Sequence, residues 1–114
     1  MNSAELKQRT ENFALRIIKL SRAIPKDDDA GRVINGQVIR SGTSVASNYR
    51  ATCRARSKAE FIAKIGTVEE EADETAFWLE LLAESGIAIR QSVIHNNQLR
   101  VGYSSAAPWF PPCS

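Results

Sequence analysis

Apolar residues recur along most of this chain at alternating intervals of three and four residues. The pattern fills three stretches, at about 3–24, 30–55 and 58–85. An α-helix turns once every 3.6 residues, so this spacing gathers apolar side chains into one stripe along each helix. Such a stripe is buried when another helix lies nearly parallel or antiparallel to it. The expected core positions are Leu6, Thr10, Phe13, Ile17, Leu20, Ile24, Ile34, Val38, Ser41, Val45, Tyr49, Phe61, Ile65, Val68, Ala72, Thr75, Leu79 and Leu82.

Start and stop signals flank these stretches. Pro25 ends the first helix, because the residue before a proline avoids helical geometry. Asp28 or Asp29 can cap the second helix, and residues 57–60 (Ser-Lys-Ala-Glu) match the capping box that opens the third. Gly86 suits a left-handed stop after the third.

Two glycines interrupt the second helix. Gly36 and Gly42 each weaken an isolated helix by about 1 kcal/mol relative to alanine. The small residues 41–44 (Ser-Gly-Thr-Ser) therefore need a structural reason. Close approach of a neighbouring helix is the simplest one.

The periodic pattern fades after Gly86. We expect a helical bundle over residues 1–88 and a poorly patterned segment over 89–114, irregular or disordered at 104–114, where prolines exclude a helix. No strand-like alternation of useful length occurs. The predicted fold class is all-α, an up-down bundle.

Length and composition fit one globular domain. The chain has 114 residues, of which 43% are hydrophobic and 25% charged. No apolar run approaches the roughly 20 residues that a membrane-spanning helix needs. The first residues lack the charged-then-apolar pattern of a signal peptide, so a cytoplasmic location is expected.

The net charge of +2 conceals a marked division. Residues 1–58 carry twelve basic and five acidic side chains, whereas 59–114 carry three basic and eight acidic ones. This division indicates an electrostatic partner or oppositely charged faces that pair within an assembly.

The second helix and the turn after it contain basic residues and no acidic ones between positions 30 and 59. The guanidinium fork of arginine matches phosphate, which favours a nucleic-acid or polyanion surface. A solvated face, or salt bridges to the acidic third helix, explains the same pattern. The predicted nucleic-acid-binding residues are Arg32, Arg40, Arg50, Arg54, Arg56 and Lys58.

The third helix carries the complementary charge, and apolar residues interrupt its polar side. This combination indicates a contact surface for a second subunit or a partner, with wider burial inside one bundle as the alternative. The predicted interface residues are Glu70, Asp73, Glu74, Phe77, Trp78 and Leu81.

Catalytic arrangements are hard to build from this sequence. The single histidine, His95, forms no recognisable nucleophile–base pair with the two distant cysteines and belongs to no Glu-x-x-His pair of a di-iron site. No Gly-x-x-x-x-Gly-Lys-Ser/Thr phosphate loop occurs. We therefore expect no enzyme, cofactor or metal site.

Three segments resemble a known family. Residues 40–51 (RSGTSVASNYRA), 55–66 (ARSKAEFIAKIG) and 71–82 (EADETAFWLELL) are similar to its helical signatures. This is the bacterial four-helix-bundle family of the ribosomal-RNA intervening-sequence type, related to the accessory proteins of diversity-generating retroelements. The resemblance covers about residues 10–88.

The resemblance implies an antiparallel four-helix bundle that assembles into a homopentamer and has no known catalysis. The retroelement members bind nucleic acid and a reverse transcriptase. Here the fourth helix is expected to be degenerate or missing, and a frameshifted C-terminus is one explanation. We expect a non-catalytic oligomeric bundle that binds RNA or DNA through its basic face. The alternative is a protein–protein scaffold or accessory subunit, for example of a reverse transcriptase.

Overall fold

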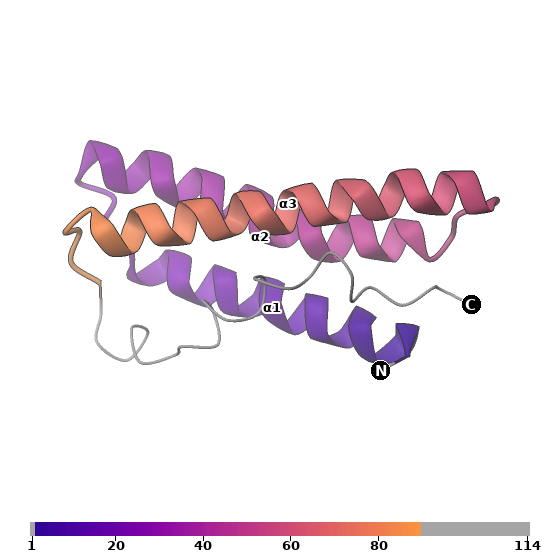
Figure 1. Ribbon diagram of the computed structural model, residues 1–114. Coiled ribbons are helices and arrows are strands. Elements are labelled where there is room, and N and C mark those ends of the chain that lie inside the picture. Colours follow the sequence, from indigo (N-terminus) through magenta and orange to yellow (C-terminus); the bar gives the residue numbers. More distant parts are fainter. Residues whose placement is uncertain (1, 90–114) are drawn as a thin grey trace.

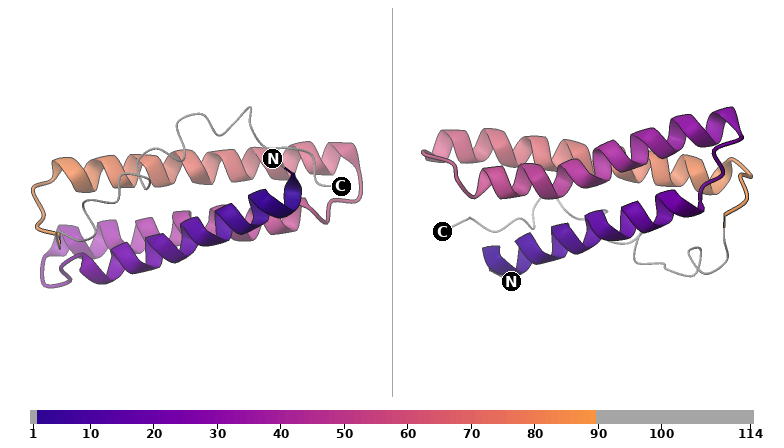
Figure 2. Two further views of the ribbon diagram at one scale, coloured as in Figure 1. Left: turned by 90° about the horizontal axis from the view of Figure 1, so that it is seen from below. Right: turned by 180° about the vertical axis from the view of Figure 1, so that it is seen from behind.

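Three long helices form an up-down-up arrangement (Figure 1). The computed structural model describes residues 2–89, which contain α1 (Ser3–Ala23), α2 (Asp29–Thr52) and α3 (Lys58–Glu84) and no strand. Helix α2 packs against both α1 and α3, and consecutive helices run antiparallel (Figure 2). The all-α prediction is confirmed. The segment in which the fourth helix is expected to be degenerate or missing, and the irregular tail, lie outside the described residues.

Side-chain caps set the start of each helix. Asn2, Asp28 and Ser57 each accept a hydrogen bond from the backbone N–H three residues ahead, at 2.9, 2.8 and 3.1 Å. These bonds satisfy N–H groups that have no partner within the helix. Gly86 adopts φ +80°, as expected for a left-handed stop after α3.

Helix α2 ends at Thr52, three residues before the end that its sequence suggests. The backbone N–H groups of Arg54 and Ala55 bond to carbonyls three residues back, at 3.0 Å each. Such bonds tighten the last turn and close the helix. The chain then reverses within a few residues to reach the cap of α3 at Ser57.

The buried residues follow the predicted stripes. One cluster joins all three helices around Ile17, Val38 and Leu79, and a second lies around Tyr49 and Val68. Of the buried hydrophobic residues, Ala76 alone lies off the predicted positions. Leu6, Phe13, Phe61 and Ile65 are only partly buried.

Small side chains occupy the level between the two clusters. Ser41 on α2 and Thr75 on α3 are fully buried, and each donates its hydroxyl to a carbonyl of its own helix, at 2.8 and 2.7 Å. Gly42 faces α1 at the same level, where a Cβ would lie 2.8 Å from Cγ1 and 2.9 Å from Cγ2 of Ile17. The close approach predicted for this segment is confirmed at Gly42.

Replacing Gly42 with alanine is expected to lower the free energy of unfolding by about 1–3 kcal/mol. The new methyl group would meet the β-branched side chain of Ile17, which is stiff and fully buried. Gly36→Ala is the matched control, because nothing lies within 4 Å of its Cβ position. The free energy of unfolding of Gly36→Ala should rise by about 0.5–1 kcal/mol, because alanine favours the helix over glycine. Urea unfolding followed by circular dichroism checks both, and equal stabilities would contradict this packing.

Alkaline pH is expected to destabilise the fold through Tyr49. Burial raises the pKa of the Tyr49 phenol above its ordinary value near 10. Above that value the unfolded chain loses this proton more readily than the folded one, so stability falls as pH rises. Tyr49→Phe should lose less stability than wild type between about pH 8 and about pH 11. Equal pH dependence in urea titrations would refute the assignment.

Candidate nucleic-acid interface

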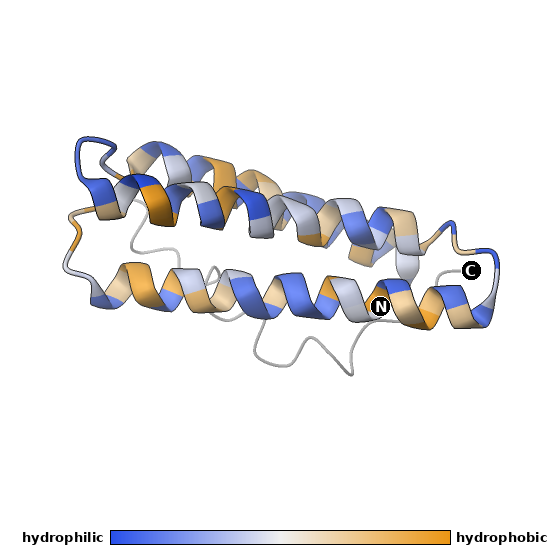
Figure 3. Ribbon diagram, turned by 90° about the horizontal axis from the view of Figure 1, so that it is seen from above, coloured by the Kyte–Doolittle hydropathy of each residue, from blue (hydrophilic) through white to orange (hydrophobic). Residues whose placement is uncertain are grey.

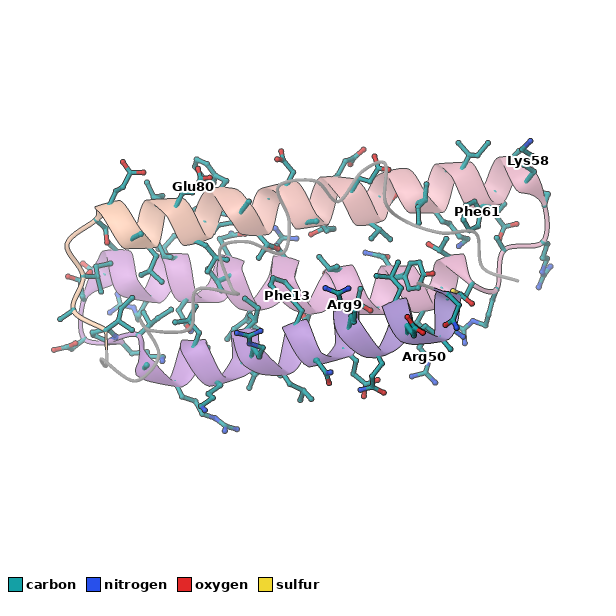
Figure 4. The ribbon with its side chains drawn as sticks, turned by 60° about the horizontal axis from the view of Figure 1, so that its bottom comes forward. Arg9, Phe13, Arg50, Lys58, Phe61 and Glu80 are labelled. Carbon is teal, nitrogen blue, oxygen red and sulfur yellow. The ribbon has the colours of Figure 1, made fainter. Side chains whose placement is uncertain are left out.

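Four basic side chains surround the turn between α2 and α3, and we call them the basic corner: Arg50, Arg54, Arg56 and Lys58. All four are exposed. Within residues 2–89 no ion pair engages any of them. Figure 4 shows Arg50 and Lys58 at the same end of the molecule. Their charges are therefore available to an anionic partner.

Two other predicted basic residues are already paired within the chain. Arg40 pairs with Glu71 at 3.2 Å and also with Glu74, and so joins α2 to α3. Arg32 pairs with Asp29 in the first turn of its own helix. The interpretation as salt bridges to the third helix thus holds for Arg40, whereas Arg32 pairs within its own helix, and the structure separates both from the basic corner.

Helix polarity adds to the positive potential of the basic corner. Lys58 occupies the first turn of α3, and Arg56 directly precedes its cap. The N-terminus of a helix carries a partial positive charge, so cations there are disfavoured. The N-terminus of α1 lies at this same end of the molecule (Figure 1). Glu5 and Glu60 lie in the first turns of these two helices, and the excess of positive charge that remains at this end favours a bound anion.

Charge is distributed unevenly along the molecule. Residues 2–12 and 45–68, which form the end with the basic corner, hold seven basic and three acidic side chains. The remaining described residues hold six basic and ten acidic ones. The division seen in the sequence therefore becomes a difference between the two ends. A polyanion would be steered to the end that carries the basic corner.

The predicted interface residues on α3 fall into two groups. Glu74 accepts a hydrogen bond from Trp78 Nε1 at 3.3 Å besides pairing with Arg40, and Trp78 packs against the Ile17 cluster. These two residues are therefore integrated into the bundle. Phe77 and Leu81 are 53% and 40% exposed, and the remaining two members, Glu70 and Asp73, are also exposed.

The sequence interpretation missed one exposed apolar residue of α3. Ile62 is 57% exposed and shares the outer side of the helix with Phe77. A helical wheel at 100° per residue places the two about 60° apart, so the signal was present in the sequence.

Among the described residues, no three His, Cys, Asp or Glu side chains gather to hold a metal ion.

The family model described as 23S rRNA-intervening sequence protein matches residues 2–100. The chain belongs to this family. The match extends beyond the segment 10–88 that carries the resemblance in the sequence, and it reaches past the last described residue. No curated protein matches the chain.

A solved structure agrees with the intervening-sequence family assignment. It is the crystal structure of a protein with unknown function from the S23 ribosomal protein family of Bacteroides thetaiotaomicron. The two chains share 31% sequence identity and superpose with a TM-score of 0.74. The similarity covers 90% of this chain and 91% of that chain.

Among the described helices, none combines the length and the hydropathy required to cross a membrane.

Arg40 and Arg50 are expected to differ in their effect on stability. Arg40→Gln removes the pair with two carboxylates, of which Glu71 is only 20% exposed, and should lower the free energy of unfolding by about 1 kcal/mol. High salt should reduce this loss. Arg50→Gln should change stability by less than about 0.5 kcal/mol, because no partner is lost. Similar losses in urea titrations of the two variants would contradict the distinction.

Proposed function

We propose that this member of the intervening-sequence family is a non-catalytic protein that binds nucleic acid through its basic corner. The observation that carries the proposal is a set of four exposed cations without an ion pair in the described chain, at an end where two helices begin. Three of the four are arginines, whose planar fork donates two hydrogen bonds to a phosphate.

Family membership supports the choice of nucleic acid over another polyanion. The matching family is named for an intervening sequence of 23S ribosomal RNA, and the similar solved structure is that of a protein from a ribosomal protein family. These names connect the relatives with RNA. For this chain, RNA is therefore the first polyanion to test, with DNA of the same sequence as the comparison.

Phosphate contacts are expected to supply most of the affinity. Four neutralised phosphates predict a slope of about −3.6 for the logarithm of the binding constant against that of salt concentration on a B-form duplex. The slope for a single strand is shallower, at about −2.8. Arg40 is left out of this count, because its charge is already paired with Glu71 and Glu74.

Fluorescence anisotropy with labelled RNA and DNA of about 20 nucleotides, single-stranded and duplex, tests the proposal between about 50 and about 200 mM salt. Arg50→Gln with Arg54→Gln should weaken binding and make the slope shallower by about 2 units. The matched control is Lys19→Gln with Arg22→Gln, which removes the same charge from exposed positions of α1.

No binding at low salt, or equal weakening by the control pair, would refute the basic corner as the binding surface. Circular dichroism of each variant verifies that the helices are intact.

A protein–protein scaffold is the second candidate function. The observation that favours it is the exposure of Phe77 and Leu81 beside carboxylates on α3. This surface is separate from the basic corner, so both functions can reside in one chain. The homopentamer that the resemblance implies stays a prediction, for which light scattering at low and high salt is the test.

A further inference from the structure

Helix α3 has two sides that both carry apolar residues. Its inner side packs on α2 and α1 through Val68, Leu79 and Leu82. The opposite side forms a second stripe, which we call the outer strip: Ile62, Gly66, Glu70, Asp73, Phe77 and Leu81. At 100° per residue these positions fall within an arc of about 100°. Figure 3 shows hydrophobic residues distributed along the helices. A helix that is apolar on two sides is typical of one covered on both.

The outer strip is open in the described structure. Ile62, Phe77 and Leu81 are 57%, 53% and 40% exposed. Nothing lies within 4 Å of a Cβ built on Gly66, so no contact among residues 2–89 accounts for a glycine in the middle of this helix. Replacing it with alanine would favour the helix by about 1 kcal/mol. The glycine instead leaves a flat place between the apolar ends, where another backbone can approach.

The charges of the outer strip specify the occupant. Glu70 and Asp73 lie between the apolar ends, Glu69 adjoins them, and Glu84 follows Leu81 at the end of the helix. Within the described residues these four carboxylates form no ion pair. Ile62 and Phe77 are about 22 Å apart along the helix axis. The complementary ligand is a helix with apolar residues near both ends and Lys or Arg between them.

The other described helices do not offer that pattern. Among the described residues, α1 exposes one large apolar side chain, Leu15, and α2 exposes one, Val33. Neither helix by itself presents large exposed apolar side chains at both ends of such a span, and the α3 of a second copy would set Glu70 and Asp73 against the same carboxylates. A second copy of this bundle therefore fits the strip less well than a helix with cations at its centre.

We infer that the outer strip of α3 docks a cationic amphipathic helix from another protein. Phe77 and Leu81 form the main apolar anchor, since both are exposed and one turn apart. Phe77 is held in position by an edge-on contact with Trp78, whose ring centroid lies 5.0 Å away. Trp78 Nε1 donates a hydrogen bond to Glu74, and Glu74 pairs with Arg40. These contacts hold in place the Trp78 ring against which Phe77 packs. The inference stands independently of nucleic-acid binding.

The test uses the full-length protein and a synthetic probe. The probe is an alanine-rich helical peptide of about 24 residues, with leucines in its first and last turns and lysines between them on the same face. The control peptide carries glutamates in place of the lysines. Isothermal titration calorimetry measures the binding of each, and sedimentation velocity measures the mass of the protein.

The lysine peptide should bind at least tenfold more tightly than the glutamate peptide. Phe77→Ala with Leu81→Ala should weaken its binding about tenfold or more. Leu15→Ala with Val33→Ala, which removes similarly exposed apolar side chains from α1 and α2, should change it less than about twofold.

A second variant separates docking from folding. Gly66→Gln raises helix propensity, so it should stabilise the fold. The larger side chain fills the centre of the outer strip, so it should weaken the binding of the lysine peptide. Any of three results would overturn the inference. The two peptides could bind equally, Leu15→Ala with Val33→Ala could weaken binding as much as the anchor variant does, or Gly66→Gln could leave binding unchanged. Self-association that Phe77→Ala with Leu81→Ala abolishes would also overturn it, because a second copy would then occupy the strip.

Discussion

The contact between Gly42 and Ile17 determines how closely the helices of this protein can pack. A Cβ at position 42 would lie 2.8 Å from Ile17 Cγ1, closer than two carbon atoms can approach without displacement. The contact between α2 and α3 also contains small, fully buried side chains, Ser41 of α2 and Thr75 of α3. The small residues of both contacts lie at one level of the bundle, between the two apolar clusters. This level sets the rotation of α2, and with it the direction in which its arginines project.

The arginines of α2 differ in their surroundings. Arg40 lies where it reaches Glu71 and Glu74 across the α2–α3 contact. Arg50 projects from the last turn, near the end of the hairpin, where the acidic stretch of α3 does not extend. Apart from Glu60 in the first turn, the acidic residues of α3 begin at Glu69, well after the start of the helix. Carboxylates of α3 thus neutralise Arg40 in the middle of the bundle, whereas the positive charge of Arg50 at its end stays available. The proposed binding surface follows from this difference.

Much of this fold is predictable from the sequence because the 3.6-residue period is local. The stripe through Ile17, Val38 and Leu79 and the caps at Asp28 and Ser57 follow from residue types and spacing alone. The role of Arg40 does not follow, because it depends on the rotation of α2 relative to α3, which one helix does not encode. The exposure of Phe77 also depends on what covers the outer side of α3. Tertiary placement therefore decides between interpretations that the sequence leaves open.

We propose that nucleic acid binds at the α2–α3 turn and leaves the rest of the bundle unaltered. Nuclear magnetic resonance of nitrogen-labelled protein, titrated with the RNA duplex, tests it residue by residue. Amide shifts should concentrate between Arg50 and Glu60 and should vanish in the Arg50→Gln and Arg54→Gln double variant. Shifts centred instead on the turn between α1 and α2, or persisting unchanged in that variant, would contradict it.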